Sequence, residues 1–171
     1  DNEVNLWEER GCYCGVCVRL FRESLRQRFG TIDALNEAWG TPLWSQTYQS
    51  FEQIPAPDSG TWHHPSLATA WLLFQSDSFA EYIAHQAAVL HRYVSVPVGT
   101  DMMPILSVGY ERMHRELDIV QYNHYDTMPG LWRQVFWMDY VRTFKKAPFW
   151  NTETSPCWNG SGAANGYREP G

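Results

Sequence analysis

The sequence predicts an α/β fold of parallel βαβ units, and two features of the chain carry this prediction. Helical stretches and short β-rich runs alternate in the order helix, strand, helix, strand, helix, strand. Polar residues follow directly after each β-rich run. Alternation of this kind favours parallel strands joined by right-handed crossovers, which bring the carboxyl ends of the strands to one edge of the sheet.

The helices are predicted from the spacing of apolar residues and from the residues at their ends. Apolar residues recur at helical spacing over 16–29, and a glycine follows. Thr31 then caps a shorter helix that Gly40 closes. A long apolar stripe beginning at Pro65 predicts a helix to about Tyr93. Further helical stretches are expected at 109–115 and 129–145.

Three β-rich runs predict strands, at 94–100, 117–122 and 147–150. Between residues 41 and 64 the periodicity fails, and prolines, a glycine and several aromatic residues predict a long ordered loop. The tail over 159–171 is rich in glycine and asparagine and has no periodicity. No element is therefore expected there.

Composition limits the possible function classes. The chain of 171 residues can bury a core of its own, but a whole (β/α)₈ barrel needs about 200 residues or more. A net charge of −6 with no basic block argues against nucleic acid or an anionic membrane as a partner. No apolar stretch of about 18 residues occurs to span a membrane. The 9 Trp, 9 Tyr and 8 Phe can form core or stack on sugar rings.

Two glutamates near the ends of the chain are the candidate catalytic residues. Glu153 follows the apolar run at 147–150, so its carboxylate is expected at the carboxyl end of a strand, where barrel enzymes gather catalytic groups. Asn2 and Glu3 read as the end of another strand. Two carboxylates facing one sugar are the minimum equipment for glycoside hydrolysis. The alternative is that one or both are solvated surface acids.

Three cysteines, Cys12, Cys14 and Cys17, lie on a predicted turn that leads into a helix. Thiolates at this spacing can converge on one Zn²⁺, which prefers four soft or borderline ligands in a tetrahedron. No fourth ligand is adjacent, and three reduced thiols are the alternative. Cys157 stands alone far along the chain and is not expected to bind the same ion.

Several strings in the sequence match one known family. Asp1-Asn2-Glu3, the cysteine cluster, residues 29–41 and the Trp44-Ser45-Gln46-Thr47-Tyr48 run together resemble glycoside hydrolase family 42, the β-galactosidases of clan A. Further matches follow in the family's order at 65–67, 74–78 and 148–153. The resemblance covers nearly the whole chain and is most specific between Gly30 and Tyr48.

The resemblance implies that residues 1–171 are part of a catalytic (β/α)₈ TIM barrel, from about the end of strand 4 to just past strand 7, incomplete at both ends. It makes Glu3 the general acid/base, Asn2 a ligand of the sugar 2-hydroxyl and Glu153 the nucleophile. It makes the three cysteines ligands of a structural zinc whose fourth ligand lies outside the segment. No organic cofactor is implied.

The implied reaction is removal of terminal non-reducing β-D-galactose with retention. Aromatic and polar side chains after the strands or in the long loop are expected to wall the site, and they are Trp44, Tyr122, His124, Tyr125 and Trp150. The chain departs from the family pattern at Val4-Asn5 and at Thr152 and Thr154, which flank Glu153. Because such neighbours line the subsites, these departures put the exact glycoside in doubt.

Two other functions are weighed. One is a clan A glycosidase of the arabinopyranosidase or glucosidase type, and the other is a non-catalytic, zinc-stabilised fragment. The expected partners are a galactoside substrate and the remainder of the barrel, with a homo-oligomer for the full-length protein in the cytoplasm. The 171-residue segment alone is expected to be inactive, because three strands cannot close a barrel of eight.

Overall fold

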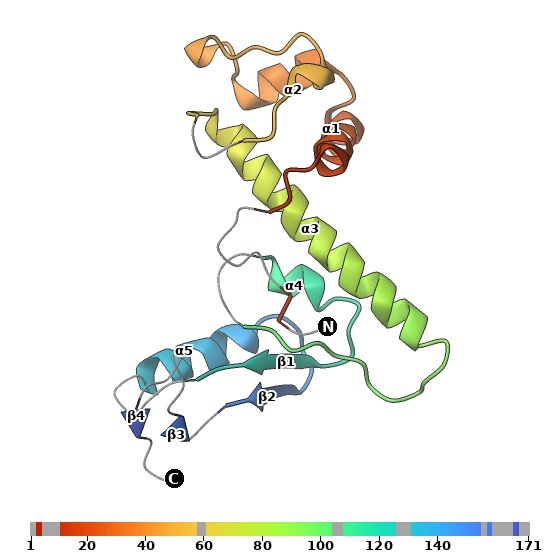
Figure 1. The fold of residues 1–171 in the computed structure, drawn as a ribbon, viewed down its shortest axis with the longest axis vertical. Coiled ribbons are helices and arrows are strands. Elements are labelled where there is room, and N and C mark those ends of the chain that lie inside the picture. Colours follow the sequence, from red (N-terminus) through yellow and green to blue (C-terminus); the bar gives the residue numbers. More distant parts are fainter. Residues whose placement is uncertain are drawn as a thin grey trace. The chain divides into compact units, whose positions relative to one another are not determined.

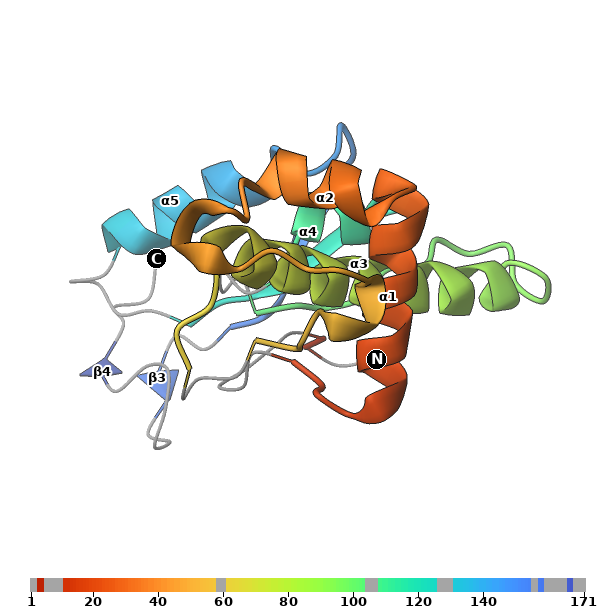
Figure 2. The ribbon, with the colours of Figure 1, turned by 90° about the horizontal axis from the view of Figure 1, so that it is seen from above.

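The computed structural model describes residues 3–4, 11–57, 61–103, 108–125, 131–154, 157–158 and 166–167. The chain divides into two compact units. One unit comprises Trp7–Ser76, and the other comprises Asp1–Leu6 with Asp77–Gly171. Helix α3 (Pro65–Leu90) is continuous and contributes to both units (Figures 1 and 2).

The unit of residues 7–76 is helical. It holds α1 (Gly15–Phe29), α2 (Ile32–Trp39), two 3₁₀ turns, η1 (Leu43–Ser45) and η2 (Phe51–Gln53), and the first part of α3. Thr31 caps α2 by accepting a hydrogen bond from the Ala34 amide, as predicted. Gly30 and Gly40 end the two helices with positive φ, 73° and 64°, which glycine adopts without steric cost.

The core of this unit forms around Trp71, whose ring meets Phe21 edge-on at 4.9 Å between centroids. Apolar side chains from α1, α2, α3, η2 and the residue after η2 complete this core: Leu25, Leu35, Phe51, Ile54 and Leu67. The predicted long loop is held in place by Asn36, whose amide donates to the Tyr48 carbonyl and accepts from the Tyr48 amide. A buried asparagine thus replaces the regular backbone pairing that the loop lacks.

The other unit contains the predicted βαβ crossover. Strand β1 (Val120–Asn123) is followed by α5 (Leu131–Val141) and β2 (Phe149–Glu153), and the two strands pair in parallel (Figure 1). The short helix α4 (Tyr110–Met113) precedes β1. Apolar side chains pack in a second core: Ile83, Ala87, Val98, Met102, Tyr110, Met113, Leu117, Val120, Tyr122, Val141 and Phe144.

The register of β1 and β2 assigns their side chains to two faces. Val120 pairs with Phe149 and Gln121 with Trp150, and Asn123 pairs with Glu153 after a β-bulge. Because side chains alternate along a strand, Gln121 and Asn123 lie on the face opposite to Tyr122. Tyr122 is on the apolar core side and Asn123 on the polar side.

The strand predicted at 94–100 is not a regular strand. Its later residues nevertheless run beside β1, because the Asp118 amide donates to the Val98 carbonyl and the Asn123 amide to the Met102 carbonyl. Gly99 permits this approach, since a Cβ there would lie 2.7 Å from Cγ1 of Ile119. Two isolated bonds do not make a regular ladder, so the β-rich composition overstates the strand.

The C-terminal tail holds an element that the sequence does not predict. Strands β3 (Cys157–Trp158) and β4 (Gly166–Tyr167) form a small antiparallel pair. Two-residue strands are too short to carry a periodic pattern, so sequence periodicity cannot detect them. Among the described residues, no helix has both the length and the apolar composition that crossing a membrane requires.

Candidate active site and cysteine cluster

The polar face of β1 and β2 brings together the two glutamates that the sequence singles out. Asn123, at the end of β1, is fully buried, and its side-chain amide nitrogen lies 3.1 Å from Oε1 of Glu3 and 3.1 Å from Oε2 of Glu153. The same nitrogen lies 3.0 Å from Oδ2 of Asp101. Three carboxylates from three separate segments therefore meet at one amide group.

The separation of the two glutamates is limited by this shared donor. The two oxygens that bind Asn123 can be no farther apart than two 3.1 Å bonds laid end to end. Inverting glycosidases hold their carboxyl groups about 6.5–9.5 Å apart to admit a water, whereas retaining enzymes hold them about 5–5.5 Å apart. The two glutamate oxygens that contact Asn123 are therefore closer together than the separation typical of inverting enzymes.

Tyr125 adds a second donor to this site. Its hydroxyl is hydrogen-bonded to Glu153, and burial, this bond and the charges of Glu153, Glu3 and Asp101 raise the pKa of Tyr125. A phenol with a raised pKa stays protonated and continues to donate. Glu153 thus receives hydrogen bonds from both Asn123 and Tyr125.

Glu3 has an unusual backbone conformation. Its φ is 50°, in the left-handed region that non-glycine residues seldom adopt. Such conformations cost of order 1–3 kcal/mol and cluster at functional sites. The position of the Glu3 carboxylate on Asn123 is therefore held at an energetic cost by its surroundings.

The residues predicted to line the sugar site lie in different environments. Trp150 is 52% exposed and pairs with Gln121, so it lies on the same face of the sheet as Asn123. His124 is buried, and its backbone amide donates to the Glu153 carbonyl at 3.0 Å. Asn2 and the side chain of Trp44 lie outside the part of the chain that the structure describes.

Tyr122, which is predicted to contact substrate, lies away from the face that carries Asn123. Its side chain is fully buried in the apolar core and packs against Phe149 with 6.2 Å between ring centroids. The alternation of β1 directs it away from the face that carries Asn123. Tyr122 instead supports the strand on which Asn123 lies.

Sequence reasoning missed Asp101 and Asn123 as site residues. Both have the signal that identified Glu153, because each is a polar residue at the end of a β-rich run. The register that places them on one face was not available from the sequence, and Asn123 was expected to follow β1 whereas it is the last residue of the strand.

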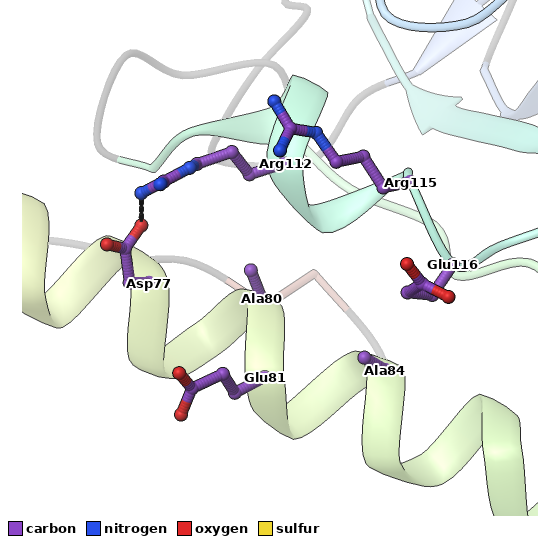
Figure 3. A pocket seen from close by; sticks show the side chains of 7 residues that line it. All are labelled: Asp77, Ala80, Glu81, Ala84, Arg112, Arg115 and Glu116. Atoms are coloured by element: carbon purple, nitrogen blue, oxygen red, sulfur yellow. Dashed lines mark hydrogen bonds and ion pairs between the residues drawn. The ribbon is translucent and has the colours of Figure 1, made fainter.

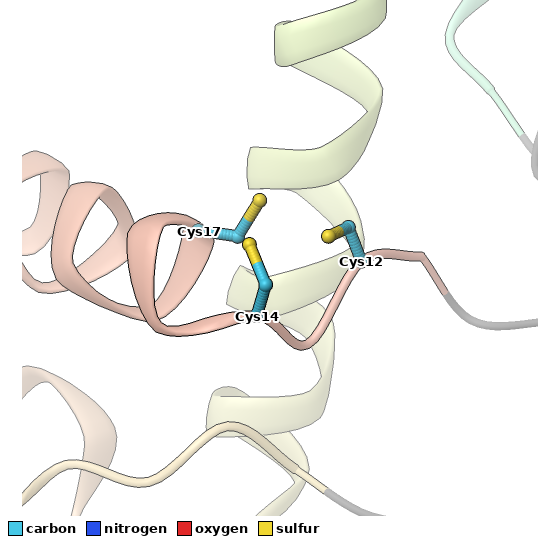
Figure 4. Close-up of side chains that lie close together, drawn as sticks. All are labelled: Cys12, Cys14 and Cys17. Carbon is cyan, nitrogen blue, oxygen red and sulfur yellow. The ribbon is translucent and has the colours of Figure 1, made fainter.

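The three cysteines converge at the N-terminus of α1 (Figure 4). Cys14 is the N-cap of the helix and Cys17 lies in its first turn, and the three sulfur atoms are within 4.8 Å of one another. The loop is fixed from outside, because the Cys12 amide donates to Oε1 of Gln75 at 3.1 Å. Three convergent thiols form a donor set that suits zinc.

The thiols of the cluster are not equivalent. A hydrogen bond from the Cys17 amide, with others from Cys12, Cys17 and Val16, lowers the pKa of Cys14 to about 7. Burial and the neighbouring thiols raise the pKa of Cys17 to about 12. Backbone N–H groups at a helix N-terminus stabilise a thiolate there, and a thiolate is the form that binds metal.

A charged groove lies between α3 and α4 and is lined by Asp77, Ala80, Glu81, Ala84, Arg112, Arg115 and Glu116 (Figure 3). The Arg112 guanidinium pairs with the Asp77 carboxylate across it. Side chains of both charges face the groove and two of them neutralise each other. We interpret it as a contact between two helices rather than a ligand site.

The fold and the polar cluster define a class, an α/β chain in which parallel strands end at a site with paired carboxylates. The sequence profile of glycoside hydrolase family 42, described as Beta-galactosidase, matches residues 1–171. The chain belongs to glycoside hydrolase family 42.

Relatives agree with this assignment. Beta-galactosidase YesZ of Bacillus subtilis (strain 168) is 37% identical over 158 residues, which cover 91% of this chain and 24% of that protein. Beta-galactosidase Bga of Halorubrum lacusprofundi is 48% identical over 83 residues, which cover 48% of this chain and 12% of that protein. The chain thus spans about a quarter of the length of YesZ.

Solved structures agree on the fold. The polyextremophilic β-galactosidase from the Antarctic haloarchaeon Halorubrum lacusprofundi has a TM-score of 0.81 at 32% identity, covering 91% of this chain and 26% of that chain. The β-galactosidase from Bacillus circulans sp. alkalophilus has a TM-score of 0.80 at 29% identity, covering 92% and 24%. The prediction that the chain is part of a (β/α)₈ barrel is confirmed.

Proposed function

We propose that the protein containing this chain is a retaining β-galactosidase that removes terminal non-reducing β-D-galactose by double displacement. The observation that carries the proposal is the pairing of Glu3 and Glu153 on the Asn123 amide, each at 3.1 Å. That closeness suits direct attack by a carboxylate and leaves little room for a water between the two groups. The choice of galactose as the sugar is supported by relatives that are named β-galactosidase.

The two carboxylates are assigned different roles. Glu153 is the nucleophile, because Asn123 and Tyr125 both donate to its carboxylate and hold it in place at the end of β2. Glu3 is the general acid/base, because it is the second glutamate on the Asn123 amide and therefore lies across from the nucleophile. Glu3 protonates the leaving oxygen as Glu153 attacks the anomeric carbon, and it then activates the water that releases the sugar.

Side chains around this pair are proposed to hold the sugar. Trp150 offers an exposed ring on the face that carries Asn123, and a ring there can stack on a pyranose. Asn2, Trp44 and His124 are proposed as further sugar contacts on the strength of the family pattern. A β-glucosidase or α-L-arabinopyranosidase activity remains the alternative, since Thr152 and Thr154 depart from that pattern next to Glu153.

The cysteine cluster is proposed to hold a structural zinc ion. Cys12, Cys14 and Cys17 supply three thiolates, and a fourth ligand comes from elsewhere in the protein. Residues 1–171 are proposed to belong to one catalytic barrel domain that extends beyond them in both directions. A homo-oligomeric, cytoplasmic enzyme is proposed for the full-length protein.

Substitution of the two glutamates in the full-length protein tests the assignment. Glu153→Gln should abolish turnover of an aryl β-galactoside, with a loss of about 10⁴-fold or more. Glu3→Ala should retain more activity on substrates with good leaving groups, and azide should rescue it to give the β-galactosyl azide. Proton NMR identifies the anomer of each product.

The controls distinguish a wrong role from a wrong reaction. An α-galactosyl azide from Glu3 variants would reverse the two roles. A Glu153→Gln enzyme as active as wild type would remove this pair from catalysis altogether. Aryl β-glucoside and α-L-arabinopyranoside, assayed in parallel, decide the sugar.

A further inference from the structure

The Asn123 amide has fewer N–H groups than it has carboxylate neighbours. The fully buried Asn123 amide nitrogen lies within 3.1 Å of Glu3, Glu153 and Asp101. A primary amide has two N–H groups and can donate strongly to only two of these three carboxylates at a time. One of the three carboxyl groups therefore does not accept a hydrogen bond from Asn123 at any given time, and this group can be the protonated one.

A hydroxyl on the other side of the amide fixes its orientation. Oγ1 of Thr152 lies 3.1 Å from Oδ1 of Asn123 and 3.2 Å from the Tyr122 carbonyl. Ionised carboxylates only accept hydrogen bonds, so the NH₂ end of the amide must face them. The Thr152 hydroxyl can donate to the remaining oxygen.

The β-bulge makes this contact possible. Asn123 pairs with Glu153, two residues beyond the partner of Tyr122, so Thr152 is the extra residue of β2. Its hydroxyl can then reach back to β1 while Glu153 takes the position opposite Asn123.

We propose that Asn123 is a positioning residue whose two N–H groups follow the negative charge through the reaction, with Thr152 holding the amide and Asp101 anchoring one N–H throughout. The proposal rests on the proposed two-carboxylate function. In the resting enzyme Glu3 carries the proton, so the N–H groups serve the ionised Asp101 and Glu153.

The first half-reaction exchanges one of these hydrogen bonds. The Glu3 proton passes to the glycosidic oxygen, the bond from that oxygen to the anomeric carbon breaks, and a bond forms from that carbon to Glu153. Glu153 is then a neutral ester and Glu3 an anion, so the second N–H turns from Glu153 to Glu3. When Glu3 deprotonates the attacking water and Glu153 is released, the exchange reverses. Asn123 itself neither gains nor loses a proton.

Thr152→Val in the full-length protein tests the hold on the amide. The change keeps the shape of the side chain but removes the donor, so the oxygen end of the Asn123 amide loses its contact with Thr152 and the amide can shift. We expect about a tenfold loss in kcat for an aryl β-galactoside, because small errors of position at the reacting groups cost that much or more. Thr152→Ser should restore kcat to within about twofold of wild type, since it returns the hydroxyl.

The matched control is Thr143→Val. Thr143 is exposed beyond the end of α5, and its hydroxyl donates to the Tyr140 carbonyl at 2.6 Å. It therefore loses the same kind of bond away from the site and should keep wild-type kcat. Equal kcat for wild type and Thr152→Val would overturn the proposal.

Asp101→Asn tests the anchor through the pH profile of kcat/KM. Removing one negative charge beside both glutamates makes each of them lose its proton more readily. The acidic limb, set by ionisation of Glu153, and the basic limb, set by deprotonation of Glu3, should both move to lower pH. A merely structural role would lower activity and leave both limbs in place, and that result would contradict the proposal.

Failure of this proposal and failure of the proposed function give different results. If the wild-type protein does not hydrolyse aryl β-galactosides, or Glu153→Gln does not impair it, the two-carboxylate function is wrong. If those results hold but either Thr152→Val or Asp101→Asn behaves as wild type, only the role of Asn123 is wrong. Thr152→Ser and Asp101→Asn keep the test decisive if Thr152→Val does not fold.

Discussion

A single buried polar side chain can set the pH dependence of stability, and His114 is such a residue outside the active site. The side chain is fully buried and stacks on Phe144 with 5.7 Å between ring centroids. Its Nδ1 lies 2.7 Å from the Tyr110 carbonyl and must therefore carry the proton, while Nε2 has no hydrogen-bond partner among the residues that the structure describes. Burial lowers the pKa of His114, and the charge of Lys145 lowers it further.

Stability should fall on acidification because of this residue. The folded protein keeps His114 neutral, whereas the unfolded chain binds a proton below a pH of about 6.5. The unfolded state then holds more protons, so stability is present above that pH and is lost as the pH falls through it. The loss should reach about 1 kcal/mol near pH 5.5.

His114→Phe should remove this part of the pH dependence. The melting temperature of the variant should fall less than that of wild type between pH 7.5 and pH 5.5. His85→Phe is the control, because His85 is exposed on α3 and its removal should leave the wild-type slope. An identical pH slope for His114→Phe and wild type would show that His114 does not destabilise the acid form.

The same residue scale shows where sequence reasoning succeeds at the site and where it stops. Glu3 and Glu153 are predicted from their position after strands and from the family strings, and both lie on the Asn123 amide. Asn123 and Asp101 are not predicted, because their role depends on which face of the strand they occupy. The bulge at Thr152 brings Glu153 to the position opposite Asn123, and no periodic pattern encodes a single inserted residue.

At the scale of elements, helices follow the sequence more closely than strands. The α1, α2 and α3 helices begin within one residue of the predicted positions, because an N-cap threonine, a proline and terminal glycines act locally. The run at 94–100 has β-rich composition but no regular ladder. A strand needs a partner at the right register, which is a property of the fold rather than of the segment.

Zinc binding at the N-terminus of α1 can be tested by replacing one cysteine. Cys14→Ser should reduce the zinc content of the full-length protein from one ion per chain toward none, because it removes one of three converging thiols. The melting temperature of the variant should be lower than that of wild type. Its kcat, measured well below that melting temperature, should stay near the wild-type value, since a structural ion stabilises folding rather than the reaction.

Metal analysis of protein purified without chelator measures the zinc content. Cys157→Ser is the control, since Cys157 lies far along the chain in β3 and is not expected to bind the same ion. Wild-type protein without zinc would refute the metal site. A Cys14→Ser variant that keeps full zinc occupancy would show that Cys14 is not a ligand.

The relatives of this chain are several times its length. The chain corresponds to 24% of YesZ and to 26% of the β-galactosidase from Halorubrum lacusprofundi, and its parallel sheet has two strands among the described residues. A barrel closes only with eight strands of matched tilt and shear. Parallel sheets are normally covered on both faces, so an open portion exposes apolar surface and unpaired strand edges.

A polypeptide of residues 1–171 alone should therefore show little or no hydrolysis of a chromogenic β-galactoside. Glu3 already has a strained backbone, and without a closed barrel its carboxylate loses the frame that holds it on Asn123. An error of about 1 Å between reacting groups can cost on the order of a hundredfold in rate. Large apolar side chains that are more than half exposed should bind a hydrophobic dye or promote aggregation: Tyr93, Trp132, Val135, Phe136 and Trp150.

Activity of this polypeptide is compared with that of the full-length protein under the same conditions, with Glu153→Gln in each as the blank for uncatalysed hydrolysis. Size-exclusion chromatography and dye fluorescence report its association and exposed apolar surface. A soluble monomer with turnover like that of the full-length enzyme would contradict the argument from barrel closure. It would mean that β1, β2 and the Asn123 cluster hold the two glutamates at attack distance without the rest of the barrel, so that the rigidity of the site arises within this segment.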